Sequence, residues 1–152
     1  MSPNAGALTL VLHTHLPWVL HHGRWPHGMD WLSEAVAESY LPLLAVLEPR
    51  ARPEQPLGLT IGLTPVLCEQ LSHADFVGEF RAYLAQKSHA AREDDRRFQG
   101  HGAAREAALA RGWIRFYDAR LRDFESGPDL VARFLGRPFG FESYREWLNE
   151  AN

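Results

Sequence analysis

Two short runs of the chain are almost entirely hydrophobic and rich in β-favouring residues. They are residues 8–13 (LTLVLH) and residues 57–63 (LGLTIGL). A continuous apolar run of this length is typical of a strand that is covered on both faces, as in a parallel sheet. We therefore predict two buried strands. The Thr64-Pro65 pair after the second run predicts a short helix over residues 66–72, with the threonine as its N-cap.

Between the two runs, hydrophobic residues recur at the spacing of a helix. The series extends from Leu32 to Leu47. Asp30 or Ser33 can cap this helix, because both side chains accept hydrogen bonds from backbone N–H groups. Pro42 lies inside the pattern and should kink or divide the helix, since proline has no N–H to donate.

Three further helices are predicted downstream, over residues 74–98, 103–124 and 129–135. In the second of them, Trp113 lies at helical spacing with other aromatic residues, which predicts a core position. The charged run 92–97 predicts an exposed helix face held by ion pairs. The order strand, helix, strand and then helices is that of an α/β fold with parallel strands.

The composition is that of an ordinary globular protein. The chain has 152 residues, 45% of them hydrophobic, and a net charge of −3. It lacks the basic excess of nucleic-acid-binding proteins, and no apolar run approaches the roughly 20 residues of a membrane span. We therefore expect neither nucleic acid nor membrane as a partner. The single cysteine, Cys68, cannot form an internal disulfide, so we expect a cytoplasmic protein in which this thiol is a small buried hydrophobe.

The histidines are concentrated near the N-terminus. Five of the eight lie between positions 13 and 27, together with two tryptophans. His13 and His15 follow each other at the end of the first strand, where alternate side chains point to the same side. In α/β sheets and barrels, ligands bind at the carboxyl ends of the strands. The pair could hydrogen-bond sugar hydroxyls, with tryptophan rings stacked on the sugar, or it could ligate a catalytic metal.

Several motifs in this region resemble those of one known family when they are taken in order and with their spacing. The resemblance is to the N-terminal region of glycoside hydrolase family 57, in particular to its 1,4-α-glucan branching enzymes. The matching pieces are His13-Thr14-His15-Leu16-Pro17, Trp25-Pro26, Glu38-Ser39-Tyr40-Leu41-Pro42-Leu43, Leu63-Thr64-Pro65-Val66-Leu67 and Glu69-Gln70-Leu71.

The resemblance implies a fold and a reaction. The fold is an incomplete (β/α)7 barrel, glycoside hydrolase/deacetylase-like, of which residues 1–135 would form the N-terminal part and residues 136–152 a divergent tail. The reaction is retaining cleavage of an α-1,4-glucan with transfer to a sugar hydroxyl or to water. It requires a nucleophilic and a proton-donating carboxyl group about 5–5.5 Å apart. In the family these are a Glu on a later strand and an Asp further on, and neither has a matching position here.

The site residues implied by the resemblance are His13 and His15, which would line the sugar subsite at the point of cleavage. Trp25 is a further candidate for the glucan-facing loop. We expect an α-1,4-glucan as the substrate, no cofactor, no bound metal and no catalytic residue within these 152 positions. The missing C-terminal part of the enzyme would then be a partner, and the chain alone would be inactive.

Other interpretations of the same residues remain open. The chain could be part of a metal-dependent barrel hydrolase that uses the His-x-His pair, or a non-catalytic glucan-binding module. Glu34, Glu38 and Glu69 are expected to be solvated or to favour a helix N-terminus rather than to act in catalysis. The remaining histidines of the N-terminal group are expected to be loop residues without a role: His21, His22 and His27.

Overall fold

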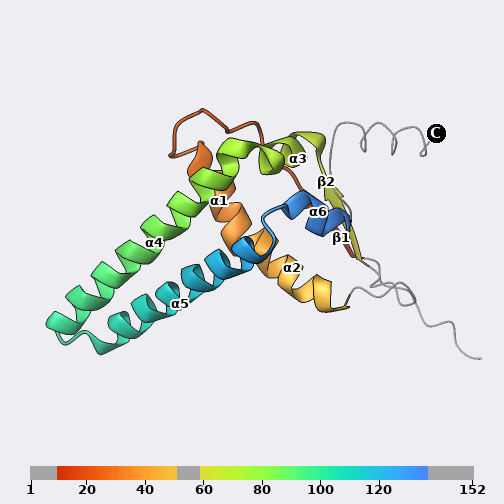
Figure 1. Ribbon diagram of the computed structural model, residues 1–152. Coiled ribbons are helices and arrows are strands. Elements are labelled where there is room, and N and C mark those ends of the chain that lie inside the picture. Colours follow the sequence, from red (N-terminus) through yellow and green to blue (C-terminus); the bar gives the residue numbers. More distant parts are fainter. Residues whose placement is uncertain (1–9, 51–58, 137–152) are drawn as a thin grey trace, which may run out of the picture.

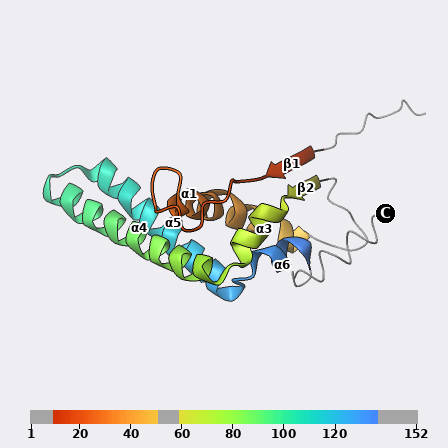
Figure 2. The same ribbon diagram turned by 90° about the horizontal axis from the view of Figure 1, so that it is seen from above.

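The computed structural model describes residues 10–50 and 59–136. Two strands, β1 (Leu10–Thr14) and β2 (Leu59–Leu63), pair in parallel, with His13 opposite Gly62. They lie at one end of the molecule, with α3 and α6 beside them (Figures 1 and 2). The parallel α/β arrangement predicted from the apolar runs is confirmed. The predicted starts of both strands and the tail from 137 onward lie outside the described residues.

The chain crosses from β1 to β2 through one almost continuous helical segment. It comprises α1 (Met29–Ala35), the π-helical turn η1 (Val36–Tyr40), α2 (Leu41–Leu47) and the 3-10 turn η2 (Glu48–Arg50). Pro42 explains the π turn, since its ring cannot donate a hydrogen bond and crowds the carbonyl four residues earlier. The N–H of Leu41 accordingly reaches the carbonyl of Val36, five residues back. The predicted interruption at Pro42 is thus a widened turn.

The predicted start of α1 was wrong. The helix begins at Met29, and its N-cap is Gly28, which has no capping side chain. Asp30 lies in the first turn and accepts a hydrogen bond from Arg24 at 3.0 Å. Ser33 is buried inside the helix. Both candidate caps therefore belong to the helix body, because the loop before α1 already holds the first N–H groups through its backbone carbonyls.

In the described part of the chain, four helices follow β2. They are α3 (Pro65–Ser72), α4 (Ala74–Gly100), α5 (Ala104–Ser126) and α6 (Leu130–Leu135). The Thr64 Oγ1 accepts the N–H of Leu67 at 3.4 Å, which confirms Thr64 as the N-cap of α3. The long antiparallel pair α4–α5 extends away from the strands as a hairpin (Figure 1). No described helix is long and apolar enough to cross a membrane.

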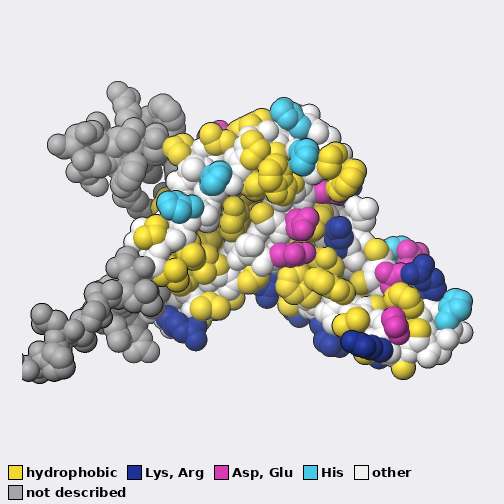
Figure 3. Space-filling view, turned by 180° about the vertical axis from the view of Figure 1, so that it is seen from behind, with side chains coloured by type: hydrophobic (Ala, Val, Ile, Leu, Met, Phe, Trp, Pro, Cys, Tyr) yellow, Lys and Arg dark blue, Asp and Glu magenta, His cyan; other side chains and the backbone are white. Residues whose placement is uncertain are grey.

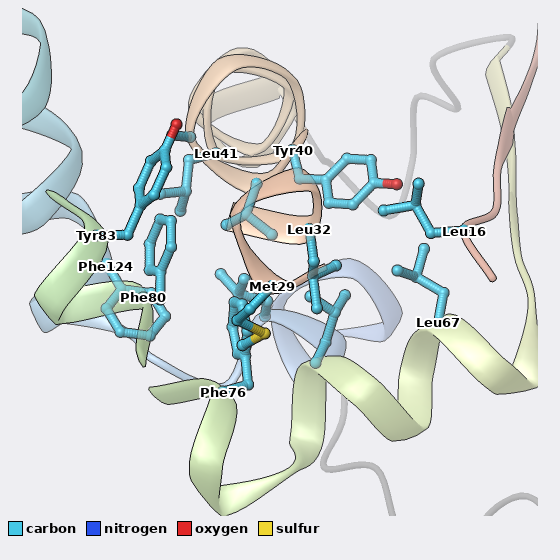
Figure 4. Close-up of a cluster of buried hydrophobic side chains, with 14 of the residues drawn as sticks. Leu16, Met29, Leu32, Tyr40, Leu41, Leu67, Phe76, Phe80, Tyr83 and Phe124 are labelled. Atoms are coloured by element: carbon cyan, nitrogen blue, oxygen red, sulfur yellow. The ribbon is translucent and has the colours of Figure 1, made fainter. Parts of the chain in front are cut away.

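The core lies where α1 and α2 cross the base of this hairpin (Figure 4). Phe76 and Phe80 of α4 stack with ring centroids 5.4 Å apart, and Phe124 of α5 meets Phe80 edge-on at 4.8 Å. Leu32 and Leu41 close the cluster from the crossing helices. Rings packed in these orientations add to the hydrophobic free energy of burial.

Ion pairs join the two helices in the outer half of the hairpin. Arg92 bonds Asp118 at 2.7 Å and Arg111 bonds Asp95 at 2.8 Å, so ion pairs link α4 to α5 as the charged run predicted. Trp113 does not lie in the core, because 47% of its surface is exposed. It stacks on Tyr117 at the edge of the cluster instead. Helical spacing identifies a face of the helix, and here the partner helices cover only part of that face.

Candidate functional site

At the carboxyl end of β1, one side chain is buried and its two neighbours in sequence are exposed. Thr14 is buried, and its hydroxyl donates to the carbonyl of Gly62 in β2 at 2.8 Å. His13 and His15 flank it in sequence and are both exposed. β1 ends at Thr14, so His13 lies on the strand and His15 is the first residue after it. The prediction that the two imidazoles share one side stays a prediction.

Gly62 leaves space beside the first histidine of the pair. It lies opposite His13 in the register of the sheet. A methyl group added at Gly62 would meet His13 Nδ1 at 3.7 Å, which is ordinary van der Waals contact. Any larger side chain would cover that flank of the imidazole. Glycine at position 62 thus leaves that flank of the His13 imidazole without a neighbouring side chain from β2.

The position of the chain after the histidines is fixed by a residue whose role the sequence analysis did not predict. Gln70 of α3 is fully buried. Its Oε1 accepts the N–H of Val19 at 2.7 Å, and its Nε2 donates to the carbonyl of Pro17 at 3.1 Å. Gln70 lies inside a motif that matched the family, Glu69-Gln70-Leu71, but only the tertiary structure shows what its amide holds.

Trp25 lies on a tight loop that projects into solvent. The Met29 N–H donates to the carbonyl of Gly23 at 2.9 Å, and the Asp30 N–H donates to that of Arg24 at 3.1 Å. A Cβ at Gly28 would lie 2.1 Å from the Gly23 oxygen, so only glycine fits at that position. The loop is therefore closed at its base by backbone contacts.

The exposure of Trp25 is extreme, since 82% of its surface is accessible. Its neighbours Gly23 and Arg24 line a groove together with Ala74 and Asp75 of α4. The loop thus runs from β1 toward the start of α4 (Figure 1). Trp25 thus lies on the side of the molecule near α4, whereas the two histidines lie at the carboxyl end of β1. The predicted assignment of all three residues to a sugar site stays a prediction.

The carboxylates considered at the sequence level lie elsewhere on the surface. Glu34 and Glu38 are exposed on the crossing segment, and Glu69 is exposed on α3. Burial, together with the charges of these first two glutamates, raises the pKa of Tyr83 and of Tyr117. The charges of Glu34 and Glu38 thus act on tyrosines of α4 and α5. The exposure of both glutamates agrees with the expectation that the pair is solvated.

The chain is similar to known enzymes in sequence. It is 44% identical over 89 residues, 59% of its length, to the 1,4-alpha-glucan branching enzyme of Thermococcus kodakarensis. It is 54% identical over 70 residues, 46% of its length, to a probable 1,4-alpha-glucan branching enzyme of Mycobacterium tuberculosis. Each match covers 13% of the relative. No protein-family model matches the chain.

Solved structures are similar over more of the chain. The GH57-type branching enzyme from Pyrococcus horikoshii matches 85% of it with a TM-score of 0.75 and 37% identity. The Thermococcus kodakarensis GH57 branching enzyme, solved in complex with glucose, matches 85% with a TM-score of 0.73 and 31% identity. The chain spans 24% and 23% of these two structures, about a quarter of each. These matches confirm the resemblance to GH57 branching enzymes and the helix-rich α/β fold. They do not favour the alternatives of a metal-dependent hydrolase or a non-catalytic glucan-binding module.

Proposed function

We propose that this chain, which is related to GH57 branching enzymes, forms the first strands and part of the glucan-binding surface of such an enzyme. The enzyme would cleave an α-1,4-glucan with retention and transfer the cut segment to a sugar hydroxyl or to water. Residues 1–135 would be the N-terminal part of its barrel. The observation that carries the proposal is the exposed His13/His15 pair at the carboxyl end of β1, in a chain whose relatives are named as branching enzymes.

The open sheet supports a larger barrel. Parallel strands are ordinarily buried on both faces and occur in sheets of several members. In the described part of this chain there are two strands, and β1 exposes 54% of Leu10 and 48% of Val11. Apolar strand residues that remain this exposed indicate that further elements pack on them in the complete enzyme. An incomplete (β/α)7 barrel supplies such elements.

The chemistry requires two carboxyl groups about 5–5.5 Å apart. The nucleophilic carboxylate attacks the anomeric carbon, while the acid protonates the departing glucosidic oxygen. The glycosyl-enzyme ester is then attacked by the 6-hydroxyl of another glucan, which forms a branch, or by water. In the second step the former acid removes the proton from the attacking oxygen. We place both carboxyl groups outside this chain.

Two ion-paired carboxylates of this chain have a pKa that is shifted in the wrong direction for the acid. Hydrogen bonds from Arg133 lower the pKa of Glu48, and hydrogen bonds from Arg81 lower that of Glu125. A general acid needs the opposite shift, so that it is protonated near neutral pH. His13 and His15 would instead bind hydroxyl groups of the sugar at the cleaved bond and hold it for attack.

The proposal also names the substrate, the metabolic process and the cellular compartment. The substrate would be a glycogen-like or amylose-like α-glucan, and the product a branched polymer, which places the enzyme in glycogen biosynthesis. The single cysteine is in keeping with a cytoplasmic protein. The 152-residue chain alone is expected to be inactive, because we place both carboxyl groups of the reaction outside it.

A chimera tests the proposal directly. Residues 10–135 replace the structurally matching segment of the Pyrococcus horikoshii branching enzyme, and branching of amylose is measured by the chain lengths released on debranching. We expect the chimera to branch amylose. His13→Ala and His15→Ala in the chimera should each lower kcat/KM at least about tenfold, because each removes hydrogen bonds to the sugar at the cleaved bond.

The matched control is His22→Ala, which removes an exposed imidazole from the same region and should leave activity unchanged. Full activity of both the His13 and His15 variants would contradict the assigned site. Branching or release of reducing sugar by the isolated 152-residue chain would contradict the placement of the carboxyl groups outside it.

A further inference from the structure

Three potential metal ligands converge where the loop after β1 meets the start of α4. His21 comes from the loop, His73 is the N-cap of α4 and Asp75 lies in its first turn. The Oδ2 of Asp75 is 3.6 Å from His21 Nε2 and 3.7 Å from His73 Nδ1. Each residue offers one ligand atom, and all three atoms lie within 4.8 Å of one another.

These separations differ from those of hydrogen-bonded pairs. An N–H···O hydrogen bond holds its heavy atoms about 2.7–3.2 Å apart. Two nitrogen or oxygen ligands at about 2.0–2.2 Å from a tetrahedral zinc ion lie roughly 3.3–3.6 Å apart. The 3.6 and 3.7 Å distances to Asp75 are close to this second value. We propose that His21, His73 and Asp75 bind a divalent transition-metal ion of the zinc type.

The tautomer of His73 suits a metal ligand. Its Nδ1 accepts the N–H of Asp75 at 3.2 Å, so this nitrogen carries no proton. A zinc ion requires a histidine nitrogen in this deprotonated state. The ion takes the place of this long hydrogen bond, and the N–H of Asp75, an exposed residue, is left to water.

The two imidazoles are held in place by their surroundings. His21 has a left-handed backbone with φ of 66°, which turns the loop back toward α4. Its ring lies edge-on to that of His73 with the centroids 5.7 Å apart, and the ring of Trp18 lies edge-on to that of His73 with the centroids 6.5 Å apart. Ligands that are already oriented lose less conformational freedom when an ion binds.

Space for the remaining coordination positions lies beside the cluster. His21 and Asp75 line a groove of about 600 Å³, which Arg24 and Glu79 also line. Three protein ligands and an open fourth position that water fills are a common arrangement of zinc. His21 and Asp75 are exposed, so an ion reaches them from solvent. Figure 3 shows that histidine side chains also lie at the surface of the face turned away from the viewer in Figure 1.

A bound ion would link the loop after β1 to α4. Among the described residues, no disulfide and no arginine–carboxylate ion pair joins these two segments. The loop carries His15 and Trp25, and α4 is the longest described helix. The ion therefore has a positioning role for the loop and takes no part in glucan cleavage. This inference does not depend on the proposed function, and zinc uptake is measured without any glucan.

The test is a zinc titration of the full 152-residue chain near neutral pH, with metal content measured after dialysis. We expect one equivalent of zinc. His21→Ala and Asp75→Asn should each weaken binding at least about tenfold, since each removes one of three ligands. His73→Asn removes the imidazole and keeps a side chain that can cap α4, so its loss of binding is not a loss of the helix start.

Three variants serve as controls. His22→Ala removes a neighbouring exposed histidine, and Cys68→Ser removes the one thiol. His89→Ala breaks an exposed histidine–carboxylate pair with Glu93, also 3.6 Å apart, which has no third ligand among the described residues. All three should bind zinc like the original chain. A chain that takes up no zinc overturns the proposal, as does zinc binding that survives His21→Ala and Asp75→Asn or is lost in a control.

Discussion

Gln70 is the residue on which the position of the His13–His15 segment depends most clearly. It is buried, and its one amide serves both the carbonyl of Pro17 and the N–H of Val19. A buried backbone group without a partner costs about 1–3 kcal/mol. Glutamine supplies a donor and an acceptor at once, which few other side chains of this size do.

We expect Gln70→Met to lower the free energy of unfolding by about 2–4 kcal/mol, because the volume is kept and both hydrogen bonds are lost. Urea denaturation measures this value. The neighbouring Glu69→Ala, at an exposed position, should change it by less than about 0.5 kcal/mol. Equal effects of the two substitutions would show that the amide of Gln70 does not hold the loop.

At the scale of elements, Arg133 joins three parts of the fold. It lies on α6 and pairs with Glu48 of η2 through two bonds of 2.7 and 2.9 Å. Its Nη2 also reaches Asp123 of α5 at 3.0 Å. The guanidinium is thus held by a forked ion pair, and its hydrogen bonds hold the pKa of Glu48 below the usual 4.5. The pair ties the end of the crossing helices to the end of α5.

A carboxyl group with a lowered pKa stabilises the fold fully above its unfolded pKa and loses this contribution as the pH falls through the folded value. Glu48→Gln should therefore cost up to about 1 kcal/mol at pH 7, since the pair is partly exposed. The difference from the original chain should shrink as the pH falls below about 4.5. Thermal unfolding across pH measures it, with Glu69→Gln as the control. A difference that is independent of pH would contradict the ion-pair origin.

At the scale of the molecule, the sheet is the least covered part. Leu10 and Val11 of β1 expose about half of their surface, whereas the residues at the base of the hairpin are fully buried. Strands with free edges and exposed apolar side chains pair readily with other chains. In the proposed complete enzyme, the neighbouring strands of the barrel would cover this surface.

The isolated chain is therefore expected to self-associate through β1 as its concentration rises. Val11→Lys places a charge on that face and should shift the chain toward the monomer in sedimentation velocity. Val46→Lys is the matched control, because Val46 is a similarly exposed valine on α2 and belongs to neither strand. Equal monomer fractions for the two variants would show that association does not involve the strand.

The sequence by itself determined the elements and the family resemblance. Apolar runs, helical spacing and the Thr64-Pro65 cap are local signals, and each led to an element that the structure contains. The His13-Thr14-His15 motif and its neighbours carry the resemblance through their residue types and spacing alone. Local patterns suffice here because backbone hydrogen bonding and the period of side chains act over a few residues.

Contacts between distant segments were decided only by the tertiary structure. The start of α1 at Met29, the exposure of Trp113, the two bonds of Gln70 and the meeting of His21 with Asp75 all depend on which segments pack together. Spacing along a helix tells which residues share a face, but it does not tell how far a partner covers that face. His21 and Asp75 are far apart in the sequence, and only the fold of the loop against α4 brings their ligand atoms to one point.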